Sequence, residues 1–258
     1  VRMALNSNAA YVLGVKVMSS HVSILVTDFQ AGVLSSVFIP VQARVRPVTH
    51  LVDIIEDGVR HCREQARLNL GVISGIGLAI PGFVDSATGA CWWTPLFDRA
   101  DAPLRDLVHT RLGVPTYLEN DAKALALFEQ WFGLGRGIDN FLVLTLERGL
   151  GLGIVANGRL YRGSRGIGSE FAHIVMDPNG PPCRCGKRGC IEAYAGGGGI
   201  LNAAMAAGET GQWKHPDLTA LTIEEIIDRA RAGEAVPRKI LHRAGRVLGR
   251  GLAGMIQV

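Results

Sequence analysis

The sequence predicts an α/β protein made of two similar lobes with a cleft between them. The chain has 258 residues, of which 48% are hydrophobic, and this is enough for two modest cores. Three β-rich runs are followed by alternating helical and β-type segments, and the same opening pattern returns near residue 141. We therefore expect a first lobe over residues 1–136 and a second lobe over residues 137–258.

The first lobe begins with a predicted antiparallel meander. Its three β-rich runs cover residues 11–17, 22–28 and 32–41, and short turns separate them. Residues 48–66 then carry apolar side chains at helical spacing with charged side chains on the opposite face, which predicts a helix.

The remainder of the first lobe alternates strands and helices. The run ISGIGLAIPG indicates a buried strand that ends in a Pro-Gly turn. We expect a helix near 102–112, a strand at 114–120 and a helix from about 121 to 134. This last helix carries the apolar residues Ala124, Leu125, Phe128 and Trp131.

The second lobe repeats the opening meander, with strands predicted at 141–147, 151–158 and 159–163. A loop rich in cysteine comes next, followed by helices to the end of the chain. Thr222 and Glu225 have the spacing of a capping box at the start of one of these helices. No closing strand follows, so we expect the second lobe to be truncated and the chain to be a fragment.

Composition argues against two classes of function. Basic residues exceed acidic residues by only four, 27 against 23, which is too small an excess to indicate a nucleic-acid-binding face. No run of about 18 apolar residues occurs, so no membrane span is predicted. The sparse use of cysteine favours a reducing, cytoplasmic setting. The basic residues late in the chain are interpreted as a solvated helix face: Arg238, Lys239, Arg243, Arg246 and Arg250.

Three of the five cysteines, Cys183, Cys185 and Cys190, fall within the eight residues CRCGKRGC. Thiolates are good zinc ligands, and tetrahedral structural sites use three or four of them. The glycines between them allow the loop to curl round an ion, and His173 in EFAH is the nearest candidate for a fourth ligand. A closed site of this composition predicts structural zinc without a catalytic role. The alternative is three unpaired structural thiols.

The segment GIGSEFAHIVMD, followed by CRCGKRGCIEAYAG, resembles the signature of the ROK family (repressors, open reading frames and sugar kinases). LENDAKALAL is similar to the family's Glu-Asn-Asp-Ala motif, and IGLAIPGFVD to its Pro-Gly loop. The resemblance covers essentially the whole chain. It implies the actin-like, hexokinase-type fold of two ribonuclease-H-like lobes, in agreement with the repeated order of elements.

The resemblance also implies a sugar site. Asn120 and Asp121 stand where a strand ends and a helix begins, which is where open α/β sheets place ligand groups. The matching family residues line the sugar, so the expected set is Gly82, Asn120, Asp121, Glu170, His173 and Glu192. Other interpretations remain: Asp121 as a helix N-cap, Glu170 and Glu192 as solvated carboxylates, and His173 as a core histidine.

The first hairpin departs from the family's kinases. They carry an Asp-x-Gly-Gly-Thr pattern that holds phosphate and helps organise the metal, whereas this chain reads GVKVMSSHVS. Lys16 stands in place of the aspartate, and Met18 and Ser19 replace the two glycines. A protonated lysine cannot bind magnesium, and a methionine is unfavourable if the turn requires positive φ.

The second hairpin also departs from the kinase pattern. Where kinases carry Gly-Thr-Gly, this chain has Glu147 and Arg148 before Gly149. A carboxylate there repels a polyphosphate, although Arg148 can offset that repulsion. The glycines that remain suit a tight hairpin equally well. Binding of ATP and magnesium is therefore not expected.

The leading hypothesis is the sugar-sensing, effector-binding and oligomerisation region of a ROK-type transcriptional regulator, forming a homodimer or homotetramer. DNA would be contacted only through an N-terminal domain absent from this chain, and VRMALNSNAA resembles the junction after such a domain. The alternative is an ATP-dependent kinase of a hexose or N-acetylhexosamine, with Asp121 as general base. A zinc-stabilised interaction module without a sugar ligand is a third class.

Overall fold

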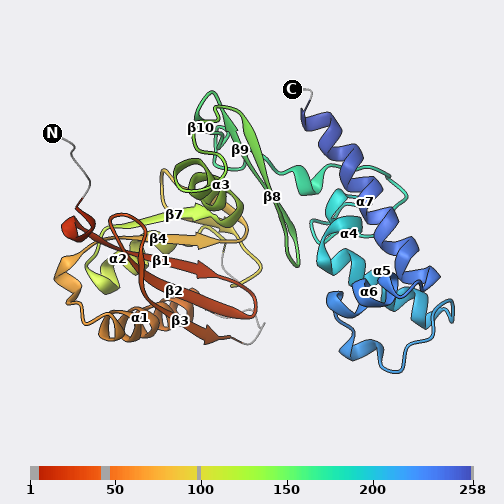
Figure 1. Ribbon diagram of the computed structural model, residues 1–258, viewed down its shortest axis with the longest axis horizontal. Coiled ribbons are helices and arrows are strands. Elements are labelled where there is room, and N and C mark those ends of the chain that lie inside the picture. Colours follow the sequence, from red (N-terminus) through yellow and green to blue (C-terminus); the bar gives the residue numbers. More distant parts are fainter. Residues whose placement is uncertain (1–5, 42–46, 98–99, 257–258) are drawn as a thin grey trace. The chain divides into compact units, whose positions relative to one another are not determined.

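The computed structural model describes residues 6–41, 47–97 and 100–256 (Figure 1). The chain divides into two compact units. The first consists of Val1–Phe141 and Val155–Gly168, and the second of Leu142–Ile154 and Ser169–Val258. The start of the expected N-terminal junction, residues 1–5, lies outside the described residues.

The first unit contains a five-stranded sheet in the described part of the chain, with the order β3-β2-β1-β4-β7. The strands are β1 (Tyr11–Val17), β2 (His21–Asp28), β3 (Val33–Pro40), β4 (Ile73–Ile80) and β7 (Thr116–Asn120). The first three form the predicted antiparallel meander. Strand β4 pairs in parallel with both β1 and β7, and this register sets Ile80 opposite Asn120.

Helix α1 (Val48–Gln65) contacts β2 and β3, and α2 (Leu104–Leu112) contacts α1 and β7. The predicted apolar face of α1 is buried, and it joins the inward side chains of the strands in one core. Gly58 lets α1 approach the sheet, because a Cβ there would lie 2.2 Å from Ile24 Cδ1. A short hairpin of β5 (Phe83–Asp85) and β6 (Ala90–Trp93) follows β4 and was not predicted. Short 3-10 helices, η1 (Ser7–Ala9) and η2 (Leu70–Val72), complete this part.

Helix α3 (Asp121–Trp131) follows β7 and turns its large apolar residues outward. Its buried residues are Ala122, Lys123 and Ala126, whereas Leu125, Phe128 and Trp131 are exposed. The apolar face of a helix usually faces the core. In α3 the small alanines allow close packing on one side, and the large apolar groups lie on the other.

The second unit begins with part of a three-stranded sheet of order β10-β9-β8 in the described residues, as predicted. These strands are β8 (Phe141–Leu146), β9 (Leu150–Ala156) and β10 (Arg159–Leu160). The helical part consists of η3 (Phe171–His173), α4 (Ile191–Ala195), α5 (Gly197–Glu209), η4 (Leu218–Ala220), α6 (Ile223–Arg231) and α7 (Ala235–Ile256). Its cores pack α4 and α5 against α7, and α6 against α7.

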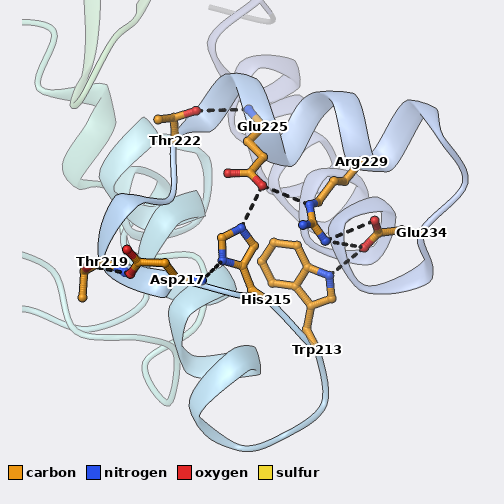
Figure 2. A network of polar contacts seen from close by, with 8 residues as sticks. All are labelled: Trp213, His215, Asp217, Thr219, Thr222, Glu225, Arg229 and Glu234. Atoms are coloured by element: carbon orange, nitrogen blue, oxygen red, sulfur yellow. Dashed lines mark hydrogen bonds and ion pairs between the residues drawn. The ribbon is translucent and has the colours of Figure 1, made fainter.

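A polar network joins the segment between α5 and α6 to α6 itself (Figure 2). The backbone amide of Asp217 donates to Nδ1 of His215 at 3.1 Å, so the ring proton lies on Nε2, which donates to Glu225 at 2.8 Å. Arg229 bridges Glu225 and Glu234, and Glu234 accepts from the Trp213 indole. Thr222 caps α6 by accepting from the amide of Glu225, which confirms half of the predicted capping box.

Within the described residues, every helix is too short or too polar to cross a bilayer.

Candidate metal centre and sugar site

The cysteine loop is a tight turn that depends on two glycines. Gly186 and Gly189 both have positive φ, of 87° and 67°. A Cβ on Gly189 would lie only 1.6 Å from the Asp177 carbonyl oxygen, so a larger residue cannot occupy this position without moving the backbone. The loop closes through the Cys183 amide, which donates to the carbonyl of Lys187 at 2.8 Å. The predicted role of the two glycines in the curl of the loop is confirmed.

The loop brings the four predicted metal ligands together. The ligand atoms of His173, Cys183, Cys185 and Cys190 all lie within 4.8 Å of one another. The sulfurs of Cys185 and Cys190 are 3.7 Å apart, and Cys183 Sγ is 3.6 Å from His173 Nδ1. In a tetrahedral zinc site these edges are about 3.8 and 3.5 Å, given Zn–S bonds of about 2.3 Å and Zn–N bonds of about 2.0 Å. The four residues therefore form a group that could hold zinc, with Nδ1 of His173 as the ligand atom.

Burial of this group favours its neutral forms. It raises the pKa of the Cys190 thiol to about 12 and also raises the pKa of Cys183. It lowers the pKa of His173, so the imidazole is neutral and keeps a lone pair for a metal. The pKa of Cys185 is lowered instead, because its burial is outweighed by hydrogen bonds from the Lys187 backbone and the other two cysteines. Since the thiols of Cys183 and Cys190 are protonated without a cation, metal binding has to release protons and must weaken in acid.

Glu192 is held by three donors from two other segments. Arg184, which lies between the first two cysteines, donates to Oε1 at 2.7 Å from Nε and to Oε2 at 2.9 Å from Nη2. The amide of Leu150 donates to Oε2 at 3.2 Å. The Glu192 side chain is only 7% exposed. A carboxylate accepts about four hydrogen bonds, so about one position remains for a ligand. Glu192 is not a solvated surface carboxylate.

The Glu192 ion pair joins the cysteine loop, the second glycine-containing turn and the first turn of α4. A Cβ on Gly149 would lie 2.8 Å from both Arg184 Nη2 and Glu192 Oε2, so the hairpin approaches this ion pair closely. Arg184 was not among the predicted site residues. Its place inside the cysteine motif, eight residues before Glu192, was the only available signal.

In the first unit, Asn120 ties the end of β7 to the Pro-Gly loop. Its Oδ1 accepts from the amides of Ala122 and Lys123 and so caps α3, and its Nδ2 donates to the carbonyl of Gly82 at 3.1 Å. Gly82 has a φ of 120°, and a Cβ there would lie 2.1 Å from the Trp93 carbonyl oxygen. Asn120 is thus the N-cap, and the alternative N-cap role for Asp121 is wrong.

Asp121 is the first residue of α3, and its Oδ1 accepts from the amide of Ala122 at 2.9 Å. The preceding Glu119, 13% exposed, accepts from Arg162 Nε at 2.7 Å and from the Asn120 amide. This contact fixes the strand end that carries Asn120 and Asp121. Arg162 was also missed from sequence, because its partner lies 43 residues away.

The predicted sugar-binding residues fall in two groups. Gly82, Asn120 and Asp121 lie together at the carboxyl ends of β4 and β7 in the first unit. Glu170, His173 and Glu192 belong to the second unit, where His173 and Glu192 are connected through the cysteine loop and Glu170 immediately precedes η3. Their assembly into one site remains a prediction.

The first hairpin turn of this chain does not use the positive φ that glycine would allow. The amide of Met18 donates to the carbonyl of His21 at 2.9 Å and closes the turn. Positive φ values at described non-glycine residues occur only at Ala31, Arg67, Asp101, Asn157 and Ser169. The turn of this chain therefore holds Met18 and Ser19 at negative φ, a conformation that ordinary side chains adopt. The second reason against phosphate binding, that Lys16 stands in place of the kinase aspartate, does not depend on the conformation of this turn.

The turn between β8 and β9, which is the second hairpin discussed above, is hydrogen-bonded to the start of α5. The carbonyl oxygen of Glu147 accepts from the amide of Gly197 at 2.9 Å, and that of Arg148 accepts from Gly198 at 2.9 Å. Free amides at a helix N-terminus form a natural anion site. At the start of α5 the amides of Gly197 and Gly198 already donate to carbonyl oxygens of the turn.

The chain belongs to the ROK family, whose sequence profile matches residues 13–258. It is 37% identical to a glucokinase from Thermotoga maritima over 194 residues, which are 71% of this chain and 60% of that protein. It is 28% identical to a xylose repressor from Bacillus subtilis over 256 residues, which are 99% of this chain and 63% of that protein. The chain thus spans about three fifths of the length of these relatives.

A solved structure supports the same assignment. The crystal structure of a ROK family transcriptional regulator, a homologue of the E. coli MLC protein, matches with a TM-score of 0.82 and 26% identity. The match covers 97% of this chain and 63% of that one. The mixed α/β fold is therefore that of the ROK family, which includes both repressors and sugar kinases among the relatives of this chain.

Proposed function

We propose that this chain is the sugar-sensing and effector-binding region of a ROK-type transcriptional regulator. The sugar would be bound by Gly82, Asn120 and Asp121 of one lobe together with Glu170, His173 and Glu192 of the other. Similarity to a xylose repressor along 99% of the chain supports this proposal. A different affinity of the sugar for two arrangements of the lobes would supply the regulatory signal.

The second turn is the observation that carries the proposal. Glu147 stands in the sequence where the family's kinases carry Gly-Thr-Gly, so its carboxylate would repel a nucleotide phosphate there. The nearby amides of Gly197 and Gly198 already donate to carbonyl oxygens. Phosphoryl transfer depends on a preorganised cradle of donors and magnesium. Lys16 in the first hairpin also removes the expected carboxylate for metal organisation. Both changes favour a protein that binds the sugar without phosphorylating it.

The contacts of the second unit support a specific way of holding the sugar. Glu192 has room for about one hydroxyl donor, because Arg184 and the Leu150 amide occupy its other positions. With Nδ1 of His173 bound to zinc, the ring proton lies on Nε2 and can donate to a second hydroxyl. Zinc would hold these second-unit residues in place and would have no catalytic role.

The alternative is an ATP-dependent sugar kinase, and one observation favours it. Asp121 is retained at the start of α3, where the family's kinases have their general base, and the chain is 37% identical to a glucokinase over 194 residues. In the sensor, the same carboxylate accepts a hydrogen bond from a sugar hydroxyl and takes up no proton.

Calorimetric titration with a panel of pentoses and hexoses tests the proposal. We expect one sugar to bind with defined stoichiometry. Asp121→Asn should weaken binding by roughly tenfold to a hundredfold, because it removes a charge-assisted hydrogen bond worth about 1.5–3 kcal/mol. As a control, Asp139→Asn changes an exposed carboxylate outside the proposed site and should bind the sugar normally. Absence of binding by every sugar would support the interaction-module alternative instead.

A further inference from the structure

The exposed side of helix α7 carries basic and small residues along nearly its whole length. The helix packs on α4, α5 and α6 through its other side, where Pro237, Ala244 and Gly251 are buried (Figure 1). The five Arg and Lys residues of α7 are all exposed, and at 100° per residue they fall within about 140° of the helix circumference. We call these residues the α7 basic face: Arg238, Lys239, Arg243, Arg246 and Arg250.

The positive charge of the chain is concentrated on this one helix. Helix α7 contains five Arg and Lys residues and no Asp or Glu. The whole chain has a formal net charge of +4, and α7 alone contributes +5, so the residues outside α7 together carry −1. The small overall excess of basic residues therefore conceals a strongly positive helix. A clustered basic face, more than the overall balance, is what indicates a surface that binds nucleic acid.

Most of these charges have no partner inside the folded chain. Four members of the α7 basic face, all except Arg243, form no side-chain hydrogen bond or ion pair with another described residue. Arg243 stacks on the ring of Tyr194, 4.6 Å from its centroid, and donates to the Tyr194 hydroxyl at 3.3 Å. In contrast, Arg229 and Arg231 of the neighbouring α6 are both paired with carboxylates. The charges of the α7 basic face are therefore available to an external anion.

Helix α7 presents its basic face on a closely packed support. A Cβ on Gly251 would lie 2.5 Å from Ile191 Cδ1 and 3.0 Å from the Phe171 ring, so the buried side of α7 approaches its neighbours closely. On the exposed side, a Cβ on Gly245 or Gly249 would meet no atom within 4 Å. These two glycines lie among the basic residues, and they allow a partner to approach the helix backbone more closely than large side chains would.

We propose that the α7 basic face binds the phosphate backbone of double-stranded DNA without regard to base sequence. Arg and Lys contact phosphate oxygens, and such contacts hold a protein on DNA without reading its bases. Arg238 and Arg250 are about 18 Å apart along the helix axis, which is the length of about five base pairs. The major groove, about 12 Å wide, admits an α-helix. This contact adds to the one expected from an N-terminal domain, and it departs from the expectation that such a domain alone touches DNA.

The residue types of α7 favour DNA over two other anionic partners. A helix that binds an anionic membrane surface needs large apolar residues beside its charges, and among the described residues of α7 only Ile256, at the end of the helix, is both large and apolar and exposed. Protein interfaces take much of their binding energy from aromatic anchors, and α7 contains no Phe, Tyr or Trp. Arginine, which forms most of the α7 basic face, matches the geometry of phosphate.

Fluorescence anisotropy of the purified chain with two unrelated labelled duplexes of about 20 base pairs tests this proposal. Four phosphate contacts give a slope of about −3.6 for log affinity against log salt, so affinity for both duplexes should fall about 50-fold between about 50 and 150 mM salt. The double variant Arg246→Gln with Arg250→Gln should bind more weakly, and its affinity should fall only about sevenfold over this range. Arg136→Gln with Arg159→Gln is the matched control, because it removes the same charge from exposed positions outside α7 and should bind like the wild type.

Circular dichroism of each variant separates loss of binding from unfolding, and Arg238→Gln with Lys239→Gln is a second double variant that keeps the test decisive if the first folds poorly. The proposal would be overturned if the wild type did not bind at about 50 mM salt, or if the α7 variants kept the affinity and salt slope of the control. Polyglutamate bound at least as tightly as the duplexes would also overturn it, in favour of an acidic protein partner. The α7 basic face contains none of the proposed sugar-binding residues, so failure to bind sugar leaves this inference untouched.

Discussion

Replacing Arg184 by alanine is expected to destabilise the second unit and to weaken sugar binding at the same time. The substitution removes two charge-assisted hydrogen bonds, of 2.7 and 2.9 Å, from a Glu192 side chain that is 7% exposed. Removing one partner of a fully buried ion pair costs about 3–5 kcal/mol. Arg184 itself is 44% exposed, so water screens the pair. We expect a loss of about 1–2 kcal/mol, with only the Leu150 amide left to hold Glu192.

Thermal unfolding and sugar titration measure the two effects separately. For a protein of this size the expected loss lowers Tm by roughly 2–8 °C. Sugar affinity should fall by about tenfold, because the one free position of Glu192 is no longer fixed relative to His173. Arg188→Ala is the matched control, since Arg188 is exposed in the same loop, and it should change neither quantity.

Two results would refute this reasoning. If Arg184→Ala unfolds and binds sugar like Arg188→Ala, the ion pair has no role in stability or in the site. If Arg184→Lys behaves like the wild type, a single positive charge is sufficient, and the two-point contact seen at Nε and Nη2 is not required.

Further outcomes are expected for the metal centre and for the network of Figure 2. Elemental analysis should find one zinc per chain, and its removal by a chelator should lower both the Tm and the sugar affinity; unchanged behaviour of a metal-free sample would contradict the zinc assignment. The hydrogen bond from His215 is the main cause of a lowered pKa at Glu225, so its stabilisation is present above the ordinary carboxyl pKa of 4.5 and is lost as the pH falls through the lower folded value. Glu225→Gln should therefore be less stable than the wild type at pH 7, and the difference should shrink below about pH 4; a constant difference across this range would count against the assignment.

The parts of the site that were predictable from sequence depend on residues close together in the chain. Three cysteines within eight residues define the metal group almost unaided, and the structure brings His173 to them. The order of strands and helices along the chain also followed from alternating runs of sufficient length. The β5–β6 hairpin was missed because strands of three and four residues carry too little periodicity.

The orientation of α3 could not be read from its sequence pattern. Periodicity shows that Leu125, Phe128 and Trp131 share one side of a helix, but it does not say which side meets the sheet. The small side chains of Ala122 and Ala126 decide this in the folded chain, because they allow α3 to pack closely. In a similar way, the contacts of Arg162 and Arg184 depend on tertiary structure, since an isolated arginine carries no pattern.

The central claim is that this chain holds a sugar without transferring phosphate to it. The most direct measurement is ADP release in the presence of ATP, magnesium and the sugar that calorimetry finds to bind most tightly, with a ROK glucokinase as positive control. We predict saturable sugar binding and ADP release no faster than in a sample without sugar. Sugar-dependent ADP release at a rate of about one per second or more, typical of kinases, would contradict the account and establish the chain as a sugar kinase.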